Sequence, residues 1–575
     1  MSDDETPSVS SDGGRAVAVP GGGRPERGDW QVFAALALVL LVGFGASVRP
    51  GVLWWGMDDL TAYVIHGRNL LSGLPYEAIE TVNDPGLPAA HLRTSFPPVL
   101  PVIIGVTERL VSDRGPEPDY VEEVLPGGVT LRVEQQPPGD DDPDRPYDLP
   151  VLVFKRVLVG FLATATLLWG FVLRRALPTP VVLCVLAAVM LHPYVFAFRE
   201  LVRAEFVYLA LLAGWFLCVQ RLDEAREDGA TRWGTAVLAG VLLYLAYATR
   251  SAAMVLVPTL LVWDVLRWRR LRVTSLVLMA VAGLGWFVQQ QALGSVESGY
   301  ADQAQDMFGL HVVVENAQQL RWKFERLFDP RAGVGGSGLA GALMLAVAAV
   351  AVIGGLSRLR RPSILDVYGA GYLAMLLLLP THSAWLRYLL PWLPVLGLWV
   401  ASGTLFLARL PWGARIPRVA PVLLSAIYVS AWPAAVAAEP DDEGLADPDT
   451  REAFAWVEEL VGPDEPVLFS KSRTLTLATG RPSLGYPRLY AHGELSDDVV
   501  TRHFAAVGLE WLLLKHSGPL EVGPYGMLDH CDREFLEGVP DPETGLLRNG
   551  WAAGHADALR EVRRNDDYVL LRWEP

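Results

Sequence analysis

Cysteine and charged residues are both scarce in this 575-residue chain, which has three cysteines and only 19% charged residues. Cys184 and Cys218 lie in apolar runs, and Cys531 is isolated near the C-terminus. No disulfide framework or zinc-binding pattern can be built from that spacing. The charges that are present sum to −16, which argues against nucleic acid as a partner, because phosphate backbones attract basic surfaces.

Hydrophobic residues are abundant, at 51% of the chain, and fall in runs of roughly 15–23 residues, the length that a helix needs to cross a membrane. This pattern excludes a single soluble globule and predicts a polytopic α-helical membrane protein. Several runs are short enough to be re-entrant or interfacial segments instead. We expect about eleven spans, at residues 30–48, 151–173, 181–198, 206–220, 234–247, 252–266, 273–288, 339–356, 364–380, 388–407 and 419–438.

The placement of arginine predicts the orientation of these spans. With a cytoplasmic N-terminus, five short loops face the cytoplasm and carry 15 Arg, whereas three short outer loops carry 4. Short cytoplasmic loops are usually the basic ones. Residues 1–29 are then a disordered cytoplasmic tail, and the first span is an uncleaved signal anchor. The long segments 49–150, 289–338 and 439–575 face outward.

The first outer loop begins with an acidic pair, Asp58 and Asp59, about ten residues after the first span. A helix-like stretch follows and is interrupted at residues 72–75 by Ser-Gly-Leu-Pro. It predicts an amphipathic helix that lies on the membrane and holds both carboxylates at its surface. The simpler interpretation is that the pair caps a helix N-terminus. A second interfacial helix, rather than a span, is expected after three prolines and ends near Leu110.

Charged residues also occur in the short outer turns, where they are costly unless they face water or a cavity. One turn contains Glu200, Arg203 and Glu205, which would otherwise form a salt-bridged turn. Arg250 stands almost alone between two spans, either as a site residue or as a side chain that reaches the interface. Another turn carries three further cavity candidates, His382, Arg387 and Tyr388. The simpler interpretation of His382 is an ordinary polar loop residue. Lys155 is expected to anchor the second span at the interface.

The order and placement of these segments resemble the GT-C superfamily of membrane glycosyltransferases. The similarity is to family 39-type enzymes, which include protein O-mannosyltransferases and the lipid A aminoarabinose transferase. The common Lys-Pro-Pro of that group is Phe-Pro-Pro here, with Arg93 as the nearest cation. The matching segments are the acidic pair, Phe96-Pro97-Pro98-Val99-Leu100, Thr249-Arg250, Leu386-Arg387-Tyr388-Leu389-Leu390-Pro391 and Leu477-Ala478-Thr479-Gly480-Arg481-Pro482.

The resemblance implies a chemistry and assigns roles in it. A polyprenyl-phosphate sugar is the donor, and a hydroxyl of a lipid, polysaccharide or protein acceptor attacks outside a bacterial inner membrane, with inversion. Asp58 is the implied base, while Asp59 orients it, binds a metal or caps the helix. Arg250, Arg387 and Arg93 are the implied phosphate ligands. Either acid of the turn at residues 199–205 fits the family pattern. No cofactor is required with certainty, and a divalent cation is left open.

Two outer regions remain. Residues 112–148 contain 11 acidic residues and 3 Arg, without calcium-loop spacing, and are expected to form a solvated Pro-rich loop. Residues 439–575 alternate predicted helices and strands, which favours a small α/β domain. It carries no nucleotide-binding glycine loop and no Ser/His/Asp signature, so we expect it to bind the acceptor or to be structural.

The sequence is compatible with three functions. A GT-C glycosyltransferase, with a transmembrane region at residues 30–438, explains the acidic pair and the outer arginines. A transporter or flippase of lipid-linked glycans would also place charges in outer cavities, but the halves of the chain show no evident repeat. The third function is a non-catalytic assembly protein. Only the first predicts release of free polyprenyl phosphate.

Overall fold

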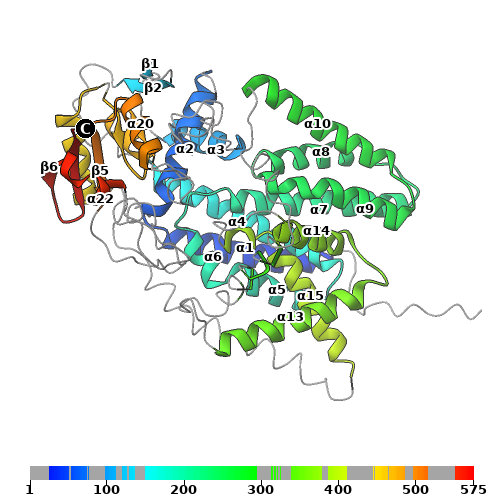
Figure 1. Ribbon diagram of the computed structural model, residues 1–575. Coiled ribbons are helices and arrows are strands. Elements are labelled where there is room, and N and C mark those ends of the chain that lie inside the picture. The colour runs from blue at the N-terminus through cyan, green and yellow to red at the C-terminus, as the bar shows by residue number, and fades with distance from the viewer. Residues whose placement is uncertain are drawn as a thin grey trace, which may run out of the picture.

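A bundle of apolar helices joined to a small C-terminal sheet makes up the computed structural model (Figure 1). Sheet and bundle lie at opposite ends of the view, and two short helices lie between them. The structure describes residues 25–50, 54–73, 97–111, 119–125, 129–135, 149–293, 338–378, 386–410, 447–463, 465–485, 497–515 and 551–574, together with Tyr76, Leu445 and parts of 313–324.

Helices occupy ten of the eleven predicted spans, and the remaining one, 419–438, lies outside the described residues. Five of them are long and apolar enough to cross a membrane. The total of eleven spans stays a prediction. The helices are α1 (Arg27–Ser47), α4 (Val151–Arg174), α5 (Thr179–Met190) with α6 (Pro193–Phe198), α7 (Glu205–Glu227), α8 (Trp233–Tyr247), α9 (Leu256–Trp268), α10 (Val273–Leu293), α13 (Gly338–Arg358), α14 (Ile364–Leu378) and α15 (Leu393–Leu407).

Helix α4 lies at the centre of the bundle and packs against α1 and α7. At Gly170 the ring of Phe33 from α1 comes so close that an added Cβ would lie 2.7 Å from it. The outer helices turn large apolar side chains away from the protein, among them Val39 at 62% exposure and Leu284 at 62% exposure. Such outward-facing apolar surface is what a helix in contact with lipid requires.

The predicted span at 181–198 is wrong in one respect, because the chain there forms two helices instead of one. Helix α5 ends at Met190, and α6 begins at Pro193, whose ring cannot continue a preceding helix. The Nδ1 atom of His192 accepts a hydrogen bond from the backbone N–H of Tyr194 at 3.0 Å and caps α6. This break directs the chain into the turn at residues 199–205.

Helices α2 (Trp54–Leu71) and α3 (Val99–Val111) are the two short helices between bundle and sheet (Figure 1). They cross at Gly67 and Gly105, where an added Cβ on Gly67 would lie 2.4 Å from a carbonyl oxygen of α3. Arg68 and Glu108 join them with two hydrogen bonds, at 2.8 and 3.2 Å. The prediction of an amphipathic surface helix is wrong for α2, since residues 60–66 are all at most 7% exposed.

The acidic insert also differs from the predicted loop. Strands β1 (Asp119–Leu125) and β2 (Val129–Gln135) pair antiparallel over seven residues each. Val and Leu alternate with polar residues in β2, which is typical of a strand, whereas the apolar and acidic residues of β1 come in pairs and gave no such signal.

The C-terminal region contains a five-stranded sheet in the order β4-β3-β5-β7-β6, parallel from β4 to β5 and antiparallel beyond. Buried aromatic residues, including Phe504, Trp551 and Trp573, fill one side of the sheet. The elements are α17 (Pro448–Leu460), β3 (Val467–Leu468), α18 (Ser472–Thr479), β4 (Ser483–Leu484), α20 (Asp497–Ala506), β5 (Trp511–Lys515), α22 (Trp551–Gly554), β6 (Leu559–Arg564) and β7 (Tyr568–Trp573).

Candidate functional site

Asp59 on α2 is the centre of a charged cluster at the sheet end of the bundle. Its Oδ2 atom lies 3.0 Å from Nη2 of Arg203 and 3.8 Å from Nη1 of Arg387. Arg203 comes from the turn before α7, and Arg387 from the short 3-10 helix η4 (Leu386–Tyr388) before α15. Three segments that are far apart in the sequence therefore meet at one carboxylate.

The C-terminal region adds two more cations to Asp59. Helix α18 packs against α2, and the hydroxyl oxygens of Thr474 and Thr61 lie 3.3 Å apart across this contact. Burial alone would raise the pKa of the Asp59 carboxyl, but the charges of Arg203, Arg387, Arg473 and Lys471 together lower that pKa below its ordinary value. Asp59 is therefore an ionised carboxylate at neutral pH.

Lys471 and Arg473 were not among the sequence-predicted site residues. The available signal was indirect: Lys471 is one of only four lysines, and it shortly precedes the segment at 477–482 that carries part of the family resemblance. The approach of α18 to α2 joins positions about 400 residues apart, as the Thr61–Thr474 pair shows with a separation of 413. Local sequence patterns do not report contacts of that kind.

The two acids of the turn at residues 199–205, Glu200 and Glu205, contact different cations. Glu200 lies 2.6 Å from Nζ of Lys155 and 3.3 Å from Arg199, and it also accepts a hydrogen bond from the backbone N–H of Arg49. Lys155 in turn donates to the carbonyl of Arg49 at 2.9 Å. The Lys155 side chain is 1% exposed, so the expectation that it anchors at the interface is wrong. This group joins the end of α1 to α4 and α6.

Glu205, at the start of α7, forms an ion pair with Arg250. Both side chains are nearly buried, at 3% and 11% exposure. Arg250 precedes the 3-10 helix η3 (Ser251–Val255), and the adjacent Ala248 carbonyl accepts a hydrogen bond from the backbone N–H of Val99, which fixes the start of α3 beside it. Arg250 does not reach into solvent, which disfavours the interpretation as a snorkelling side chain.

Tyr388 links Arg250 and Arg387, two of the three arginines that the family resemblance selects. The guanidinium carbon of Arg250 lies 4.5 Å from the centre of the Tyr388 ring, and that of Arg387 lies 5.4 Å from it. The carbonyl of Tyr388 accepts a hydrogen bond from the hydroxyl of Tyr372 at 2.9 Å. Cations held over an aromatic face keep their N–H groups available for other partners.

Two further side chains of α2 extend the site. Burial raises the pKa of the Tyr63 hydroxyl, and the charges of Asp59 and Glu205 raise it further. Burial, with a contribution from Arg473, lowers the pKa of His66 to about 3, so its imidazole is neutral at physiological pH. His66 stacks on Tyr76 with ring centres 4.4 Å apart. One face of α2 thus carries an acid, a phenol and a neutral imidazole.

The charges of the site are unequal. Among the described side chains of this cluster, five are cations (Arg203, Arg250, Arg387, Lys471 and Arg473) and two are acids (Asp59 and Glu205). Arginines that converge in this way suit a phosphate group, because each offers paired N–H donors. Among the described residues no group of three or more His, Cys, Asp or Glu side chains could hold a metal ion.

Three sequence-predicted residues cannot be placed in this geometry. Asp58 lies in α2, but its side chain is outside the description, and Arg93 and His382 lie outside the described residues. Of the remaining candidates, the structure brings together Asp59, Arg203, Glu205, Arg250, Arg387 and Tyr388, and it places Glu200 in the separate group with Lys155.

No known family model matches the sequence, and no curated protein is significantly similar to it. Solved structures are similar in fold. The oligosaccharyltransferase of Archaeoglobus fulgidus, tethered to an acceptor peptide, aligns at 14% identity and a TM-score of 0.55, covering 91% of this chain and 74% of that one. The same archaeal enzyme, AglB, in complex with an inhibitory peptide and a dolichol-phosphate, aligns at 12% identity and a TM-score of 0.57, covering 94% and 75%.

ArnT from Cupriavidus metallidurans, bound to undecaprenyl phosphate, aligns at 13% identity and a TM-score of 0.44, covering 95% of this chain and 98% of that one. The likeness to the archaeal enzyme shows the fold. The chain shares the fold of this archaeal oligosaccharyltransferase, a membrane fold of the kind that the sequence resemblance implies.

Proposed function

We propose that this protein is a membrane glycosyltransferase of GT-C type. It takes a sugar from a polyprenyl-phosphate carrier and transfers it, with inversion, to an acceptor hydroxyl on the outer face of a bacterial plasma membrane. The observation that carries the proposal is the cluster of five cations around Asp59 and Glu205, at one end of a GT-C fold. The neighbours AglB and ArnT, whose structures hold dolichol-phosphate and undecaprenyl phosphate, support a lipid-phosphate ligand.

The reaction forms a bond between the acceptor oxygen and the anomeric carbon and breaks the bond from that carbon to the phosphate oxygen. The phosphate gains negative charge as it leaves, and Arg203, Arg250 and Arg387 stabilise that charge. Such stabilisation of developing charge is usually the largest catalytic effect. The acceptor proton passes to a carboxylate base, and free polyprenyl phosphate is the second product.

The two acids of the pair take different roles. Asp59 is held below its ordinary pKa by four cations, which makes it a weak base. Its contacts with Arg203 and Arg387 suit it to hold those guanidinium groups in position. We therefore assign the base to Asp58, as the family resemblance implies, and a positioning role to Asp59.

The proposed outer domain, residues 439–575, completes the site. Lys471 and Arg473 act on Asp59 from α18, directly after strand β3. Their place beside the cluster favours a role in holding the donor phosphate, in addition to the acceptor-binding or structural role that the sequence suggested.

The experiment is a donor assay with the purified full-length protein in nanodiscs. The protein is incubated with a panel of radiolabelled polyprenyl-phosphate hexoses and pentoses and with a membrane extract as acceptor. Release of free polyprenyl phosphate together with label on the acceptor supports the proposal. Movement of intact donor between the leaflets of sealed proteoliposomes that contain the protein, without release, identifies a flippase. Neither event with any donor supports an assembly protein.

A further inference from the structure

A cavity lies at the opposite end of helix α9 from Arg250. It has a volume of about 550 Å³ and is lined by Trp263, Leu266, Arg267, Arg360, Arg361 and Pro362. Helix α9 runs from the neighbourhood of Arg250 to this cavity, a path of about 20 Å for 13 residues. The cavity is therefore separate from the site proposed for transfer.

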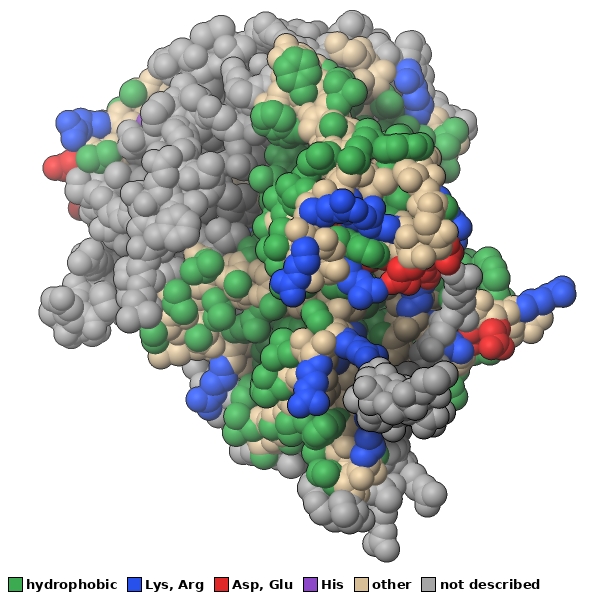
Figure 2. Space-filling view, turned by 90° about the vertical axis from the view of Figure 1, so that its right-hand side faces the viewer, with side chains coloured by type: hydrophobic (Ala, Val, Ile, Leu, Met, Phe, Trp, Pro, Cys, Tyr) green, Lys and Arg blue, Asp and Glu red, His purple; other side chains and the backbone are tan. Residues whose placement is uncertain are grey.

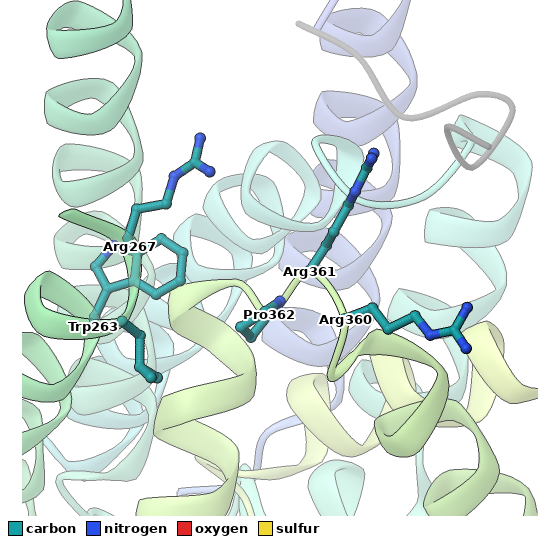
Figure 3. Close-up of a pocket in the computed structure, with 6 residues that line it drawn as sticks. Trp263, Arg267, Arg360, Arg361 and Pro362 are labelled. Atoms are coloured by element: carbon teal, nitrogen blue, oxygen red, sulfur yellow. The ribbon is translucent and has the colours of Figure 1, made fainter. Parts of the chain in front are cut away.

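Figure 3 shows how its walls are built. Trp263 and Arg267 come from the end of α9, and Arg360, Arg361 and Pro362 come from the connection between α13 and α14. The side chains of Arg267 and Arg361 rise on opposite sides of the opening, and Arg360 turns outward beside it. Lys and Arg side chains are frequent on this end of the bundle, which faces the viewer in Figure 2.

The arginines that line the cavity differ in their partners from the other arginines nearby. Arg272 pairs with Asp223 and Asp264, and Arg358 pairs with Asp366. The side chains of Arg360 and Arg361 have no ion pair or hydrogen bond to any described residue. Among the described acids, Arg267 pairs with Glu227, whose side chain is half-exposed. A pair so open to solvent contributes little to stability. The cavity thus offers cationic groups without matching acids in its described lining.

The remaining lining is apolar and continues onto the lipid-facing surface. Leu266 is 47% exposed, and the neighbouring Val265 and Leu359 are 50% and 65% exposed. Side chains of this type on a membrane helix face acyl chains, whereas tryptophan and arginine favour the headgroup level. The cavity lies where cationic and apolar side chains meet, the combination expected of a segment at the headgroup level.

We propose that this cavity binds one anionic phospholipid. Its phosphate lies between Arg267 and Arg361, with Arg360 on the outer side, and its acyl chains lie along the apolar residues of α9. In the predicted orientation this is the cytoplasmic leaflet, where basic pockets between helices bind anionic headgroups. A free phosphate ion would use the same arginines but would leave the apolar wall uncovered. This proposal does not rest on the transferase activity.

The test is native mass spectrometry of the full-length protein after exchange into detergent with equal amounts of phosphatidylglycerol and phosphatidylcholine of the same chain length. We expect selective retention of one phosphatidylglycerol. The variant Arg360→Gln/Arg361→Gln loses this retention by about 30-fold, since each arginine contributes about 1 kcal/mol. The matched control is Arg269→Gln/Arg270→Gln, which removes two exposed arginines from the connection between α9 and α10. We expect this control to retain phosphatidylglycerol as the wild type does.

Three results overturn the proposal: equal retention of both lipids, equal loss in the two double variants, or complete displacement by millimolar inorganic phosphate. The last result identifies a site for free phosphate. A thermal melt of each variant without added lipid shows that the protein is folded, so that loss of binding is not mistaken for loss of structure.

Discussion

The two ends of the helical bundle carry arginines in different arrangements. At the far end Arg272 is 3% exposed as a residue and is balanced by Asp223 and Asp264. At the sheet end five cations from the turns and from α18 share Asp59 and Glu205. Balanced buried pairs hold elements together, and removal of one partner is costly. At the sheet end Arg203 and Arg387, from different segments of the chain, converge on Asp59. Convergent arginines suit a phosphate group, which is the reason for placing the chemistry there.

The largest expected effect is on activity and comes from Asp58→Asn. Loss of a general base lowers turnover by about 10³-fold, because the acceptor proton has no carboxylate to receive it. The measurement is polyprenyl phosphate release per folded protein. Asp228→Asn, which removes an exposed carboxylate at the end of α7, is the control and retains wild-type release. If Asp58→Asn releases polyprenyl phosphate at the wild-type rate, Asp58 is not the general base.

A second pair of variants compares the two ends directly. Arg272→Met leaves two acids without their partner and is expected to cost about 3–5 kcal/mol of stability. Arg250→Gln/Glu205→Gln removes both members of the other pair, so its melting temperature stays near that of the wild type. Transfer is expected to be normal per folded molecule in the first variant and lost in the second.

If Arg250→Gln/Glu205→Gln transfers sugar at the wild-type rate, Arg250 has a structural role like that of Arg272, and the two ends of the bundle do not differ in function. Melting curves and release assays on the same preparations separate stability from activity.

The third prediction concerns His66, whose pKa of about 3 in the folded protein lies below the ordinary value of 6.5. The unfolded chain binds this proton more readily, so stability is complete above pH 6.5 and falls as the pH is lowered towards 3. The slope approaches about 1.4 kcal/mol per pH unit. His66→Asn removes this contribution. Melting temperatures measured from pH 7 to pH 4 test it, and parallel curves for both proteins would contradict a buried neutral histidine.

The smallest effect is expected from the C-terminal region. Lys471→Gln removes one cation near Asp59 and is expected to weaken donor binding roughly fivefold, about the contribution of one charged contact. Lys515→Gln is the matched control, because Lys515 lies in the same C-terminal region, in strand β5, and pairs with Asp567 at 3.8 Å. An equal effect of both changes on the donor KM would show that α18 does not serve the site.

The sequence predicts the helices better than the site. Apolar runs long enough for a helix are a local property, and helices occupy ten of the eleven predicted segments. The break at Pro193 was missed because the flanking residues are equally apolar. The burial of α2 was missed because part of its cover comes from α18, which lies about 400 residues further along the chain.

The site residues show the same division. Arg250 and Arg387 could be selected because charge is rare beside a span, and both lie in the cluster. Glu200 and Glu205 could not be separated, since they share one turn and only the positions of Lys155 and Arg250 decide between them. Lys471 and Arg473 required the packing of two helices about 400 residues apart in sequence.

We propose that the cation cluster around Asp59 serves the transfer of a sugar from a lipid phosphate. Release of free polyprenyl phosphate from labelled donors, by the nanodisc-embedded wild type and by Arg250→Gln/Glu205→Gln, tests this role without an intermediate step. We expect acceptor-dependent release by the wild type with at least one donor, and its loss in the variant, which melts normally. Equal release by both proteins, or none by the wild type with any donor of the panel, would contradict this role.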